Sequence, residues 1–144
     1  MFLVVKSGVS NEGRRDSEIT IMDIGKLTIN SVVGAIIWTN NLERLLKFYR
    51  DTLGLKPHSY QSNFVSFEMG ETRLGIGTHS EVSGQTRDPH RIMLNLGVDE
   101  INKAYELLKT KGVQFIRLPE KEHWGGWVAT FSDPDGNIIQ LMQF

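Results

Sequence analysis

The chain has 144 residues, of which 40% are hydrophobic and 23% are charged, so it can bury a core and is not disordered by composition. Its 16 Lys and Arg against 17 Asp and Glu give a formal net charge of -1, which argues against a general nucleic-acid binder and against electrostatic attachment to a membrane. It has no cysteine, which excludes a disulfide framework and a thiolate metal site, and no apolar run approaches the roughly 20 residues that span a bilayer.

Residues 1–29 are predicted to form a loosely attached N-terminal extension of a single domain that covers residues 30–144. Met1–Val5 is apolar but much shorter than the core of a secretory signal, and no small-residue cleavage pattern follows it. Residues 7–18 are polar, contain glycine and show no periodicity. We therefore expect a cytoplasmic protein.

The first half of the domain begins with a predicted strand at 32–38, which is rich in β-branched and apolar residues. An apolar stripe at positions i, i+3, i+4 and i+7 then predicts a helix, with Asn40 or Asn41 as its N-cap and Gly54 at its end. Three further strands are predicted at 55–60, 63–69 and 72–78.

The second half repeats this order, which makes an internal repeat the most informative feature of the chain. A strand is predicted at 92–98, followed by a helix that Asp99 caps and Gly112 ends. Three strands follow at 113–118, 127–131 and 137–144, with a turn at Asp133–Gly136. Each half therefore has the order β-α-β-β-β, at about 31–79 and 91–144, and residues 80–90 link them.

Strand alternation gives each half an apolar face and a mixed face. The apolar residues, expected to pack against the helices, are Ala35, Ile37, Leu74, Ile76, Leu94, Leu96, Ile139 and Leu141. The mixed face carries Gly34, Ile36, Trp38, Arg73, Gly75, Gly77, Met93, Asn95, Gly97, Ile138, Gln140 and Met142. Such a face suits a sheet that lines a ligand cavity, and the alternative is a solvated sheet face.

Two stretches of the chain resemble motifs of the vicinal oxygen chelate superfamily, the group of glyoxalases, bleomycin resistance proteins and extradiol dioxygenases. Residues 41–55 are similar to its FY-x-x-x-LG-L element and residues 131–141 to its DP-x-G-N-x-x-E-L element. With the repeat, the resemblance covers about residues 31–144. It implies an α+β fold in which two β-α-β-β-β modules form a curled mixed sheet around a central cleft.

The resemblance also implies where a metal would bind, because members with metal chemistry place four ligands on the first and fourth strands of each module. The corresponding positions are Gly34, Gly75, Met93 and Gln140. Glycine offers no donor, a thioether is a soft ligand, and a glutamine carbonyl is weaker than a carboxylate. We therefore expect no metal and no other cofactor.

Several residues are candidates for binding a small molecule. On the mixed face these are Trp38, Arg73, Met93, Asn95 and Gln140. In the run 120–127, which joins two strands and ends at the first residue of the strand at 127–131, they are His123, Trp124 and Trp127. Trp38 can stack on a ligand or fill the core, and Arg73 can bind a carboxylate or phosphate or stay solvated. The loop has two Trp around two Gly, which is typical of an aromatic flap, although it can equally pack against the extension or a second subunit.

These residues predict a metal-free protein of the bleomycin-resistance type that binds a small aromatic or amphipathic molecule in its cleft, and we expect a homodimer. One alternative is a lyase, isomerase or dioxygenase of the same superfamily, with a non-standard metal site or with His123 or Glu122 as a proton carrier. The other alternative is an interaction module that uses the cleft face as a subunit interface.

Overall fold

The computed structural model describes residues 4–7, 17–20 and 27–144, and the chain divides into two units, residues 1–32 and 33–144. In the first unit, strands β1 (Val4–Ser7) and β2 (Ser17–Thr20) pair antiparallel, a pairing that the sequence pattern does not predict. The prediction that residues 1–29 are loosely attached falls mostly on residues outside those described. No helix in the described parts of the chain has the length and hydropathy needed to cross a membrane.

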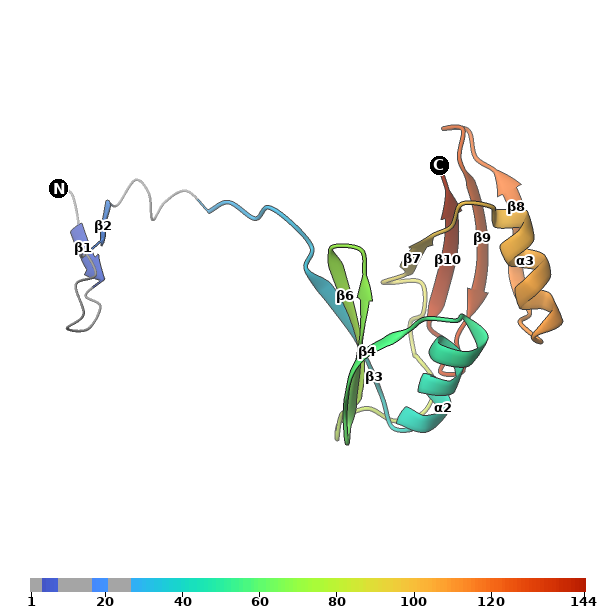
Figure 1. The fold of residues 1–144 in the computed structure, drawn as a ribbon, viewed down its shortest axis with the longest axis horizontal. Helices are drawn as coiled ribbons and strands as arrows, with labels where there is room; N and C mark the ends of the chain where they lie inside the picture. The colour runs from blue at the N-terminus through green and yellow to red at the C-terminus, as the bar shows by residue number, and fades with distance from the viewer. Residues whose placement is uncertain (1–3, 8–16, 21–26) are drawn as a thin grey trace. The chain divides into compact units, whose positions relative to one another are not determined.

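The first module of the unit 33–144 has the predicted order of elements (Figure 1). Its elements are β3 (Gly34–Thr39), α2 (Leu42–Lys47), a π-helical turn (Phe48–Thr52), β4 (Pro57–Gln61), β5 (Phe64–Met69) and β6 (Thr72–Thr78). The strands form a sheet in the order β3-β6-β5-β4, in which β3 runs parallel to β6 and the other pairs are antiparallel.

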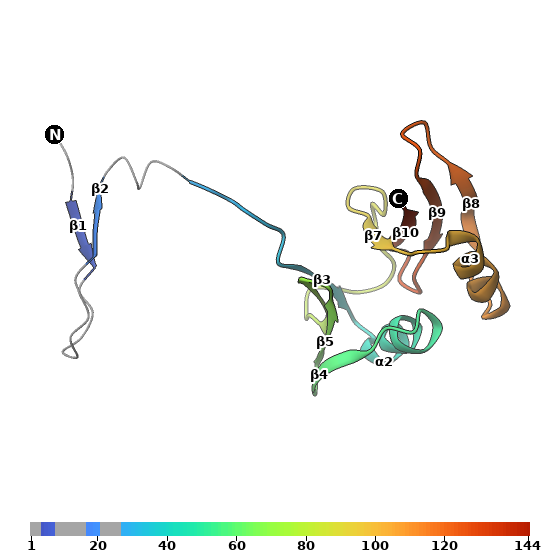
Figure 2. The ribbon, with the colours of Figure 1, turned by 45° about the horizontal axis from the view of Figure 1, so that its top comes forward.

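The second module repeats this topology. Its elements are β7 (Leu94–Gly97), α3 (Ile101–Thr110), β8 (Phe115–Lys121), β9 (Trp127–Ser132) and β10 (Ile138–Gln143). The strand order is β7-β10-β9-β8, with β7 parallel to β10. Figures 1 and 2 show one helix beside each sheet. The predicted α+β fold of two β-α-β-β-β modules is confirmed, and it consists of two separate four-stranded sheets.

The two helices begin in different ways. The side chain of Asn41 accepts a hydrogen bond of 3.1 Å from the Arg44 amide, so Asn41 and not Asn40 is the N-cap of α2. The prediction that Asp99 caps α3 is wrong, because the N-cap is Glu100, whose side chain makes no capping bond. The Ile101 amide instead donates to Gln143 Oε1 at 2.8 Å, a partner from the last strand that local sequence does not reveal.

A single hydrophobic core joins the helix-covered faces of both sheets. The predicted apolar residues of the two sheets belong to it, apart from Ala35, which is exposed on the edge strand β3. From the helices it takes Leu45, Tyr49, Ile101 and Leu108. Phe48, at the end of α2, lies against Phe131 of β9 with ring centroids 6.2 Å apart, so the first helix also packs on the second sheet.

Asp133 is the centre of a polar contact between the modules. Its carboxylate accepts hydrogen bonds from the Tyr49 hydroxyl at 2.8 Å, from the amides of Asp135 and Asn137 at 2.9 and 3.0 Å, and from Asn137 Nδ2 at 2.8 Å. Arg44 forms an ion pair with Asp135. Burial raises the pKa of both Tyr49 and Asp133, so the phenol stays protonated and donates to the carboxylate.

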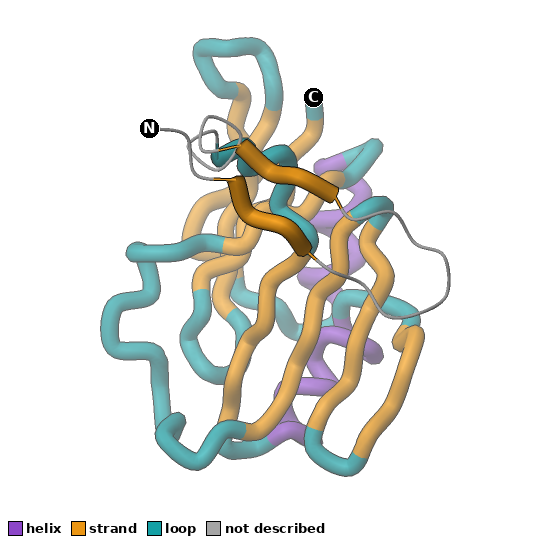
Figure 3. Tube along the Cα trace, turned by 90° about the vertical axis from the view of Figure 1, so that its left-hand side faces the viewer, coloured by secondary structure: helices purple, strands orange, loops and turns teal. Residues whose placement is uncertain are grey.

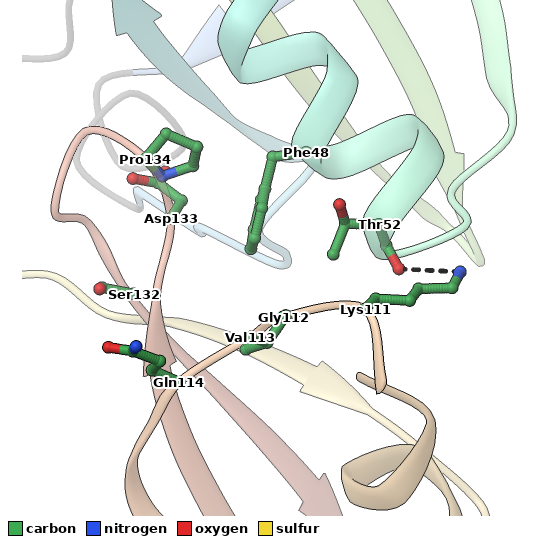
Figure 4. Close-up of a pocket in the computed structure, with 9 residues that line it drawn as sticks. All are labelled: Phe48, Thr52, Lys111, Gly112, Val113, Gln114, Ser132, Asp133 and Pro134. Atoms are coloured by element: carbon green, nitrogen blue, oxygen red, sulfur yellow. Dashed lines mark hydrogen bonds between the residues drawn. The ribbon is translucent and has the colours of Figure 1, made fainter. Parts of the chain in front are cut away.

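A small pocket of about 290 Å³ opens beside this contact (Figure 4). Lys111 lies at its edge and donates to the backbone carbonyls of Asp51 and Thr52 at 3.2 Å each. These carbonyls belong to the π-helical turn that follows α2, and a positive charge is favourable at the C-terminal end of a helix. Lys111 therefore ties the loop after α3 to the first module.

Within the ranges that the structure describes, no helix lies on one of the two faces of each sheet, and this face is here called its open face. Figure 3 shows the strands of the unit 33–144 in front of both helices, so the two open faces are turned to the same side of the unit. On the first sheet the open face includes Ile36 and Trp38, and on the second it includes Asn95 and Gln140, as the registers of the parallel pairs require. The candidate site is built on these faces.

Candidate ligand-binding site

Two aromatic side chains form a platform on the open face of the first sheet. The ring of Phe64, from β5, lies over Gly75 and Gly77 of β6: a Cβ on Gly75 would overlap Phe64 Cζ, and a Cβ on Gly77 would lie 2.7 Å from Phe64 Cδ2. Trp38, from β3, lies beside this ring, with centroids 5.9 Å apart. The rings of Trp38 and His79 are in a T-shaped contact, with centroids 5.4 Å apart. The two glycines are needed because only a strand without side chains there lets the ring lie on it.

A depression of about 810 Å³ lies next to the Phe64 ring. It is bordered by Gly34 and Ile36 of β3, by Arg73 and Gly75 of β6, and by Ser66 of β5. Its volume falls within the range of about 300 to 1,000 Å³ that small-molecule sites occupy. Ile36, which borders the depression, is 52% exposed. Trp38 does not border it but lies beside the Phe64 ring and is 38% exposed, so apolar surface is available to a ligand.

The polarity of the open face changes along the strands. Beside the platform, the hydroxyls of Ser59 and Ser66 share a hydrogen bond of 2.6 Å. Further along, Glu68 lies between His58 and Arg73, with Oε1 3.5 Å from His58 Nδ1 and 3.6 Å from Arg73 Nη2. All three of these charged or ionisable side chains are about half or more exposed. The face therefore runs from an aromatic end, through two hydroxyls, to a charged end.

The sequence-predicted residues are divided between the two sheets. Trp38 and Arg73 lie on the open face of the first sheet, whereas Asn95 and Gln140 are a pair in the register between β7 and β10. Gln140 Nε2 donates to Thr130 Oγ1 at 3.4 Å, and Met93, just before β7, is partly exposed. The fold thus brings Trp38 and Arg73 onto one surface and the other three onto a second.

The loop between β8 and β9 turns back on its own hairpin. The Trp124 ring lies against Gly126 and 5.6 Å from the ring of the C-terminal Phe144. His123 is exposed in the same turn. Trp127 packs against the hydrophobic core, on the same face of β9 as Ala129 and Phe131, and not on the open face with Trp38. The three predicted loop residues therefore point to different surroundings.

Phe64 is the residue that sequence reasoning missed. The sequence predicts the strand at 63–69 but does not assign its faces. The signal was present in the hairpin: counting outward from the turn at Gly70 pairs Phe64 with Gly77 and Ser66 with Gly75. A glycine at every second position of one strand, opposite a phenylalanine on the next, predicts a ring lying across the sheet.

The residues at the metal-ligand positions of the resembling family do not fit a metal. A Cβ on Gly34 would overlap the Arg73 carbonyl, and the place of a side chain on Gly75 is taken by the Phe64 ring. Met93 and Gln140 supply only a thioether and an amide. Among the residues that the structure describes, no three His, Asp or Glu side chains converge.

The sequence of this chain is similar to one protein family and to several known proteins. The family model of the glyoxalase/bleomycin resistance protein/dioxygenase superfamily matches residues 28–141. The uncharacterised protein YraH of Bacillus subtilis (strain 168) is 30% identical over 115 residues, which cover 71% of this chain and 89% of YraH. The bleomycin resistance protein of Klebsiella pneumoniae is 34% identical over 55 residues, which cover 33% of this chain and 44% of that protein.

Solved structures show the same fold. A glyoxalase/bleomycin resistance protein/dioxygenase from Nocardioides matches with a TM-score of 0.67 and 21% identity, over 85% of this chain and 89% of that chain. A glyoxalase-related enzyme from Fulvimarina pelagi matches with a TM-score of 0.66 and 20% identity, over 81% of this chain and 89% of that chain. At these identities the likeness is one of fold.

Proposed function

The chain belongs to the glyoxalase/bleomycin resistance protein/dioxygenase superfamily, and on that premise we propose that it binds a small aromatic or amphipathic molecule without a metal. The ligand would lie on the open face of the first sheet, against the Phe64 ring and beside Trp38. Binding of this kind needs a concave surface with apolar contact area and a few polar groups.

The observation that carries this proposal is the Phe64 ring seated on Gly75 and Gly77. Two positions of β6 lack side chains, and the space above them is given to a ring that itself borders a depression of about 810 Å³. A sheet face that served only as a solvated surface would gain from side chains at these positions, because glycine weakens a strand. The arrangement favours a flat apolar partner for the ring.

The proposal is tested by measuring the binding of aromatic compounds by calorimetry to the wild type and to Trp38→Ala. Loss of an aromatic contact at a recognition site typically costs about 1 to 3 kcal/mol, so we expect the affinity to fall by roughly 5-fold to 150-fold. Tyr60→Ala is the control, because Tyr60 is also an exposed aromatic residue but its register partner is Val65, a residue of the helix-covered face. Equal affinity of Trp38→Ala and wild type would contradict the proposal.

We also propose that two copies of the chain associate through their open faces. Apolar side chains are exposed on both sheets: Ile36 and Trp38 on the first, and Met93, Ile116 and Leu118 on or beside the second. The two faces are turned to the same side of the unit, so they do not cover each other within one chain (Figure 3). In a symmetric dimer the second sheet of one copy can cover the first sheet of the other.

Light scattering during size-exclusion chromatography checks this association. We expect a mass of twice the 16.3 kDa chain for the wild type, and a lower mass for Leu118→Glu, which places a charge in the proposed interface. Glu43→Gln, on the exposed surface of α2, should leave the mass unchanged. A wild-type protein that elutes with the mass of a single chain at micromolar concentration would contradict the dimer.

A further inference from the structure

A positively charged side chain, that of Arg73, lies next to the aromatic platform. Arg73 and Gly75 are two residues apart on the same face of β6, which places Arg73 about 7 Å along the strand from the position beneath the Phe64 ring. The Arg73 side chain borders the depression and is 66% exposed. A single substituent on a flat ligand that is stacked on the Phe64 ring could therefore reach Arg73.

The acidic groups nearby are placed less favourably for contact with such a ligand. Glu68 does not border the depression, and it lies between His58 and Arg73. Glu71 does border it but is two residues beyond Arg73, at the hairpin turn, and therefore about 13 Å along the strand from Gly75. Of the two charged side chains that border the depression, Arg73 therefore lies nearer to the ring than Glu71.

Arg73 also has unused hydrogen-bonding capacity. Its guanidinium carries five N–H donors in a planar fork that matches a carboxylate in two places. The contact between Nη2 and Glu68 Oε1 is 3.6 Å, too long for a hydrogen bond, so the pair is ionic and leaves the donors available. Glu68 therefore lies beside the cation without occupying its donors.

We propose that the ligand class is an aromatic acid, whose ring lies on Phe64 and whose carboxylate binds Arg73. This rests on the proposed function, because it requires that the platform binds a flat ring. The hydroxyls of Ser59 and Ser66 lie between the two contacts and can hydrogen-bond a polar substituent on the ring. The proposal thus assigns the charged end of the open face to recognition.

Calorimetry with three probes of matched shape tests this assignment: 2-naphthoate, 2-naphthylmethanol and 2-naphthylmethylammonium. We expect the wild type to bind the carboxylate about tenfold more tightly than the alcohol, as one charge-assisted contact at a partly exposed site provides. Arg73→Gln should weaken the binding of the carboxylate only, so that the carboxylate and the alcohol bind with equal affinity. Arg73→Lys should keep part of the preference, because it retains the charge but not the two-point contact.

Arg50→Gln is the matched control, since Arg50 is a partly exposed arginine of the π-helical turn that pairs with Asp51. Its affinities for all three probes should equal those of the wild type. If the alcohol binds as tightly as the carboxylate, or if the ammonium binds most tightly, the aromatic-acid assignment is wrong while the platform itself stands. If none of the probes binds, the proposed function fails together with this assignment.

Discussion

The packing of Phe64 on Gly75 can be tested by a double-mutant cycle. In Gly75→Ala, the new methyl group would overlap Phe64 Cζ and lie 3.0 Å from Cε2, so the ring must move off the sheet. Overpacking of this kind costs typically 1 to 3 kcal/mol, and the higher strand preference of alanine offsets about 0.5 to 1 kcal/mol of it. We therefore expect a net loss of about 1 to 2 kcal/mol in the free energy of unfolding.

The same substitution should behave differently when the ring is absent. In a Phe64→Ala background the methyl group on residue 75 has no ring to displace, so Gly75→Ala should be neutral or stabilise by about 0.5 to 1 kcal/mol. The coupling free energy between the two positions is then about 2 kcal/mol, well above the error of additivity for independent sites. Urea denaturation of the four proteins measures it.

Gly97→Ala is the control for this cycle. Gly97 lies on β7, and a Cβ there would meet nothing within 4 Å. Its substitution should therefore not destabilise the protein in either background. Should Gly75→Ala cost the same with and without Phe64, the ring does not rest on the glycine, and the reasoning that led from the glycines to an aromatic platform is refuted.

Three further predictions concern the contact between the modules. Tyr49→Phe removes a buried hydrogen bond to the Asp133 carboxylate and should lower the free energy of unfolding by about 1.5 to 3 kcal/mol in urea titrations; a change within error would mean that the contact does not stabilise the fold. Burial raises the folded-state pKa of Asp133 above its ordinary value of 3.8, so the folded protein binds a proton at Asp133 more tightly than the unfolded chain does. The protonated carboxyl therefore contributes stability below pH 3.8, and this contribution is lost as the pH rises through the folded-state pKa. As the pH rises from 3.8 through this pKa, the free energy of unfolding of the wild type should therefore fall relative to that of Asp133→Asn. A rise would contradict the raised pKa of Asp133. Gly136→Ala places a side chain at a φ of +83°, beside Gln85, and should cost about 1 to 2 kcal/mol, whereas an unchanged thermal midpoint would show that the turn can rearrange.

Much of the fold follows from local sequence pattern. The strand at Thr72–Thr78 has the predicted bounds, and the other strands of the two modules differ from prediction by a few residues at their ends. The predicted turn glycines Gly54, Gly112 and Gly136 all have positive φ. These features depend on periodicity and on backbone conformation, which neighbouring residues determine.

The candidate site was less accessible to sequence reasoning because it depends on contacts between distant strands. Alternation placed Trp38 and Arg73 on one face but could not show that Met93, Asn95 and Gln140 lie on a separate sheet. Trp127 opens the predicted strand at 127–131, but its face follows from the pairing of β9 with β10, which puts Trp127 on the core side with Ala129 and Phe131. Likewise, the bond from the Ile101 amide to Gln143 joins residues 42 positions apart.

The two hairpin turns that occupy equivalent places in the repeat differ in how firmly they are tied down. The turn at Gly70 is exposed, and a Cβ on Gly70 would meet nothing within 4 Å. The turn at Asp133–Gly136 is bonded to α2 through Arg44 and to the π-helical turn through Tyr49. It is also bonded to the linker, where the Thr86 amide donates to the Asp135 carbonyl at 2.7 Å. An insertion at the first turn should therefore leave the contact between the modules intact. An insertion at the second turn should break the bonds that join the modules. Circular permutants and inserted reporter domains would accordingly be tolerated at the first turn and not at the second.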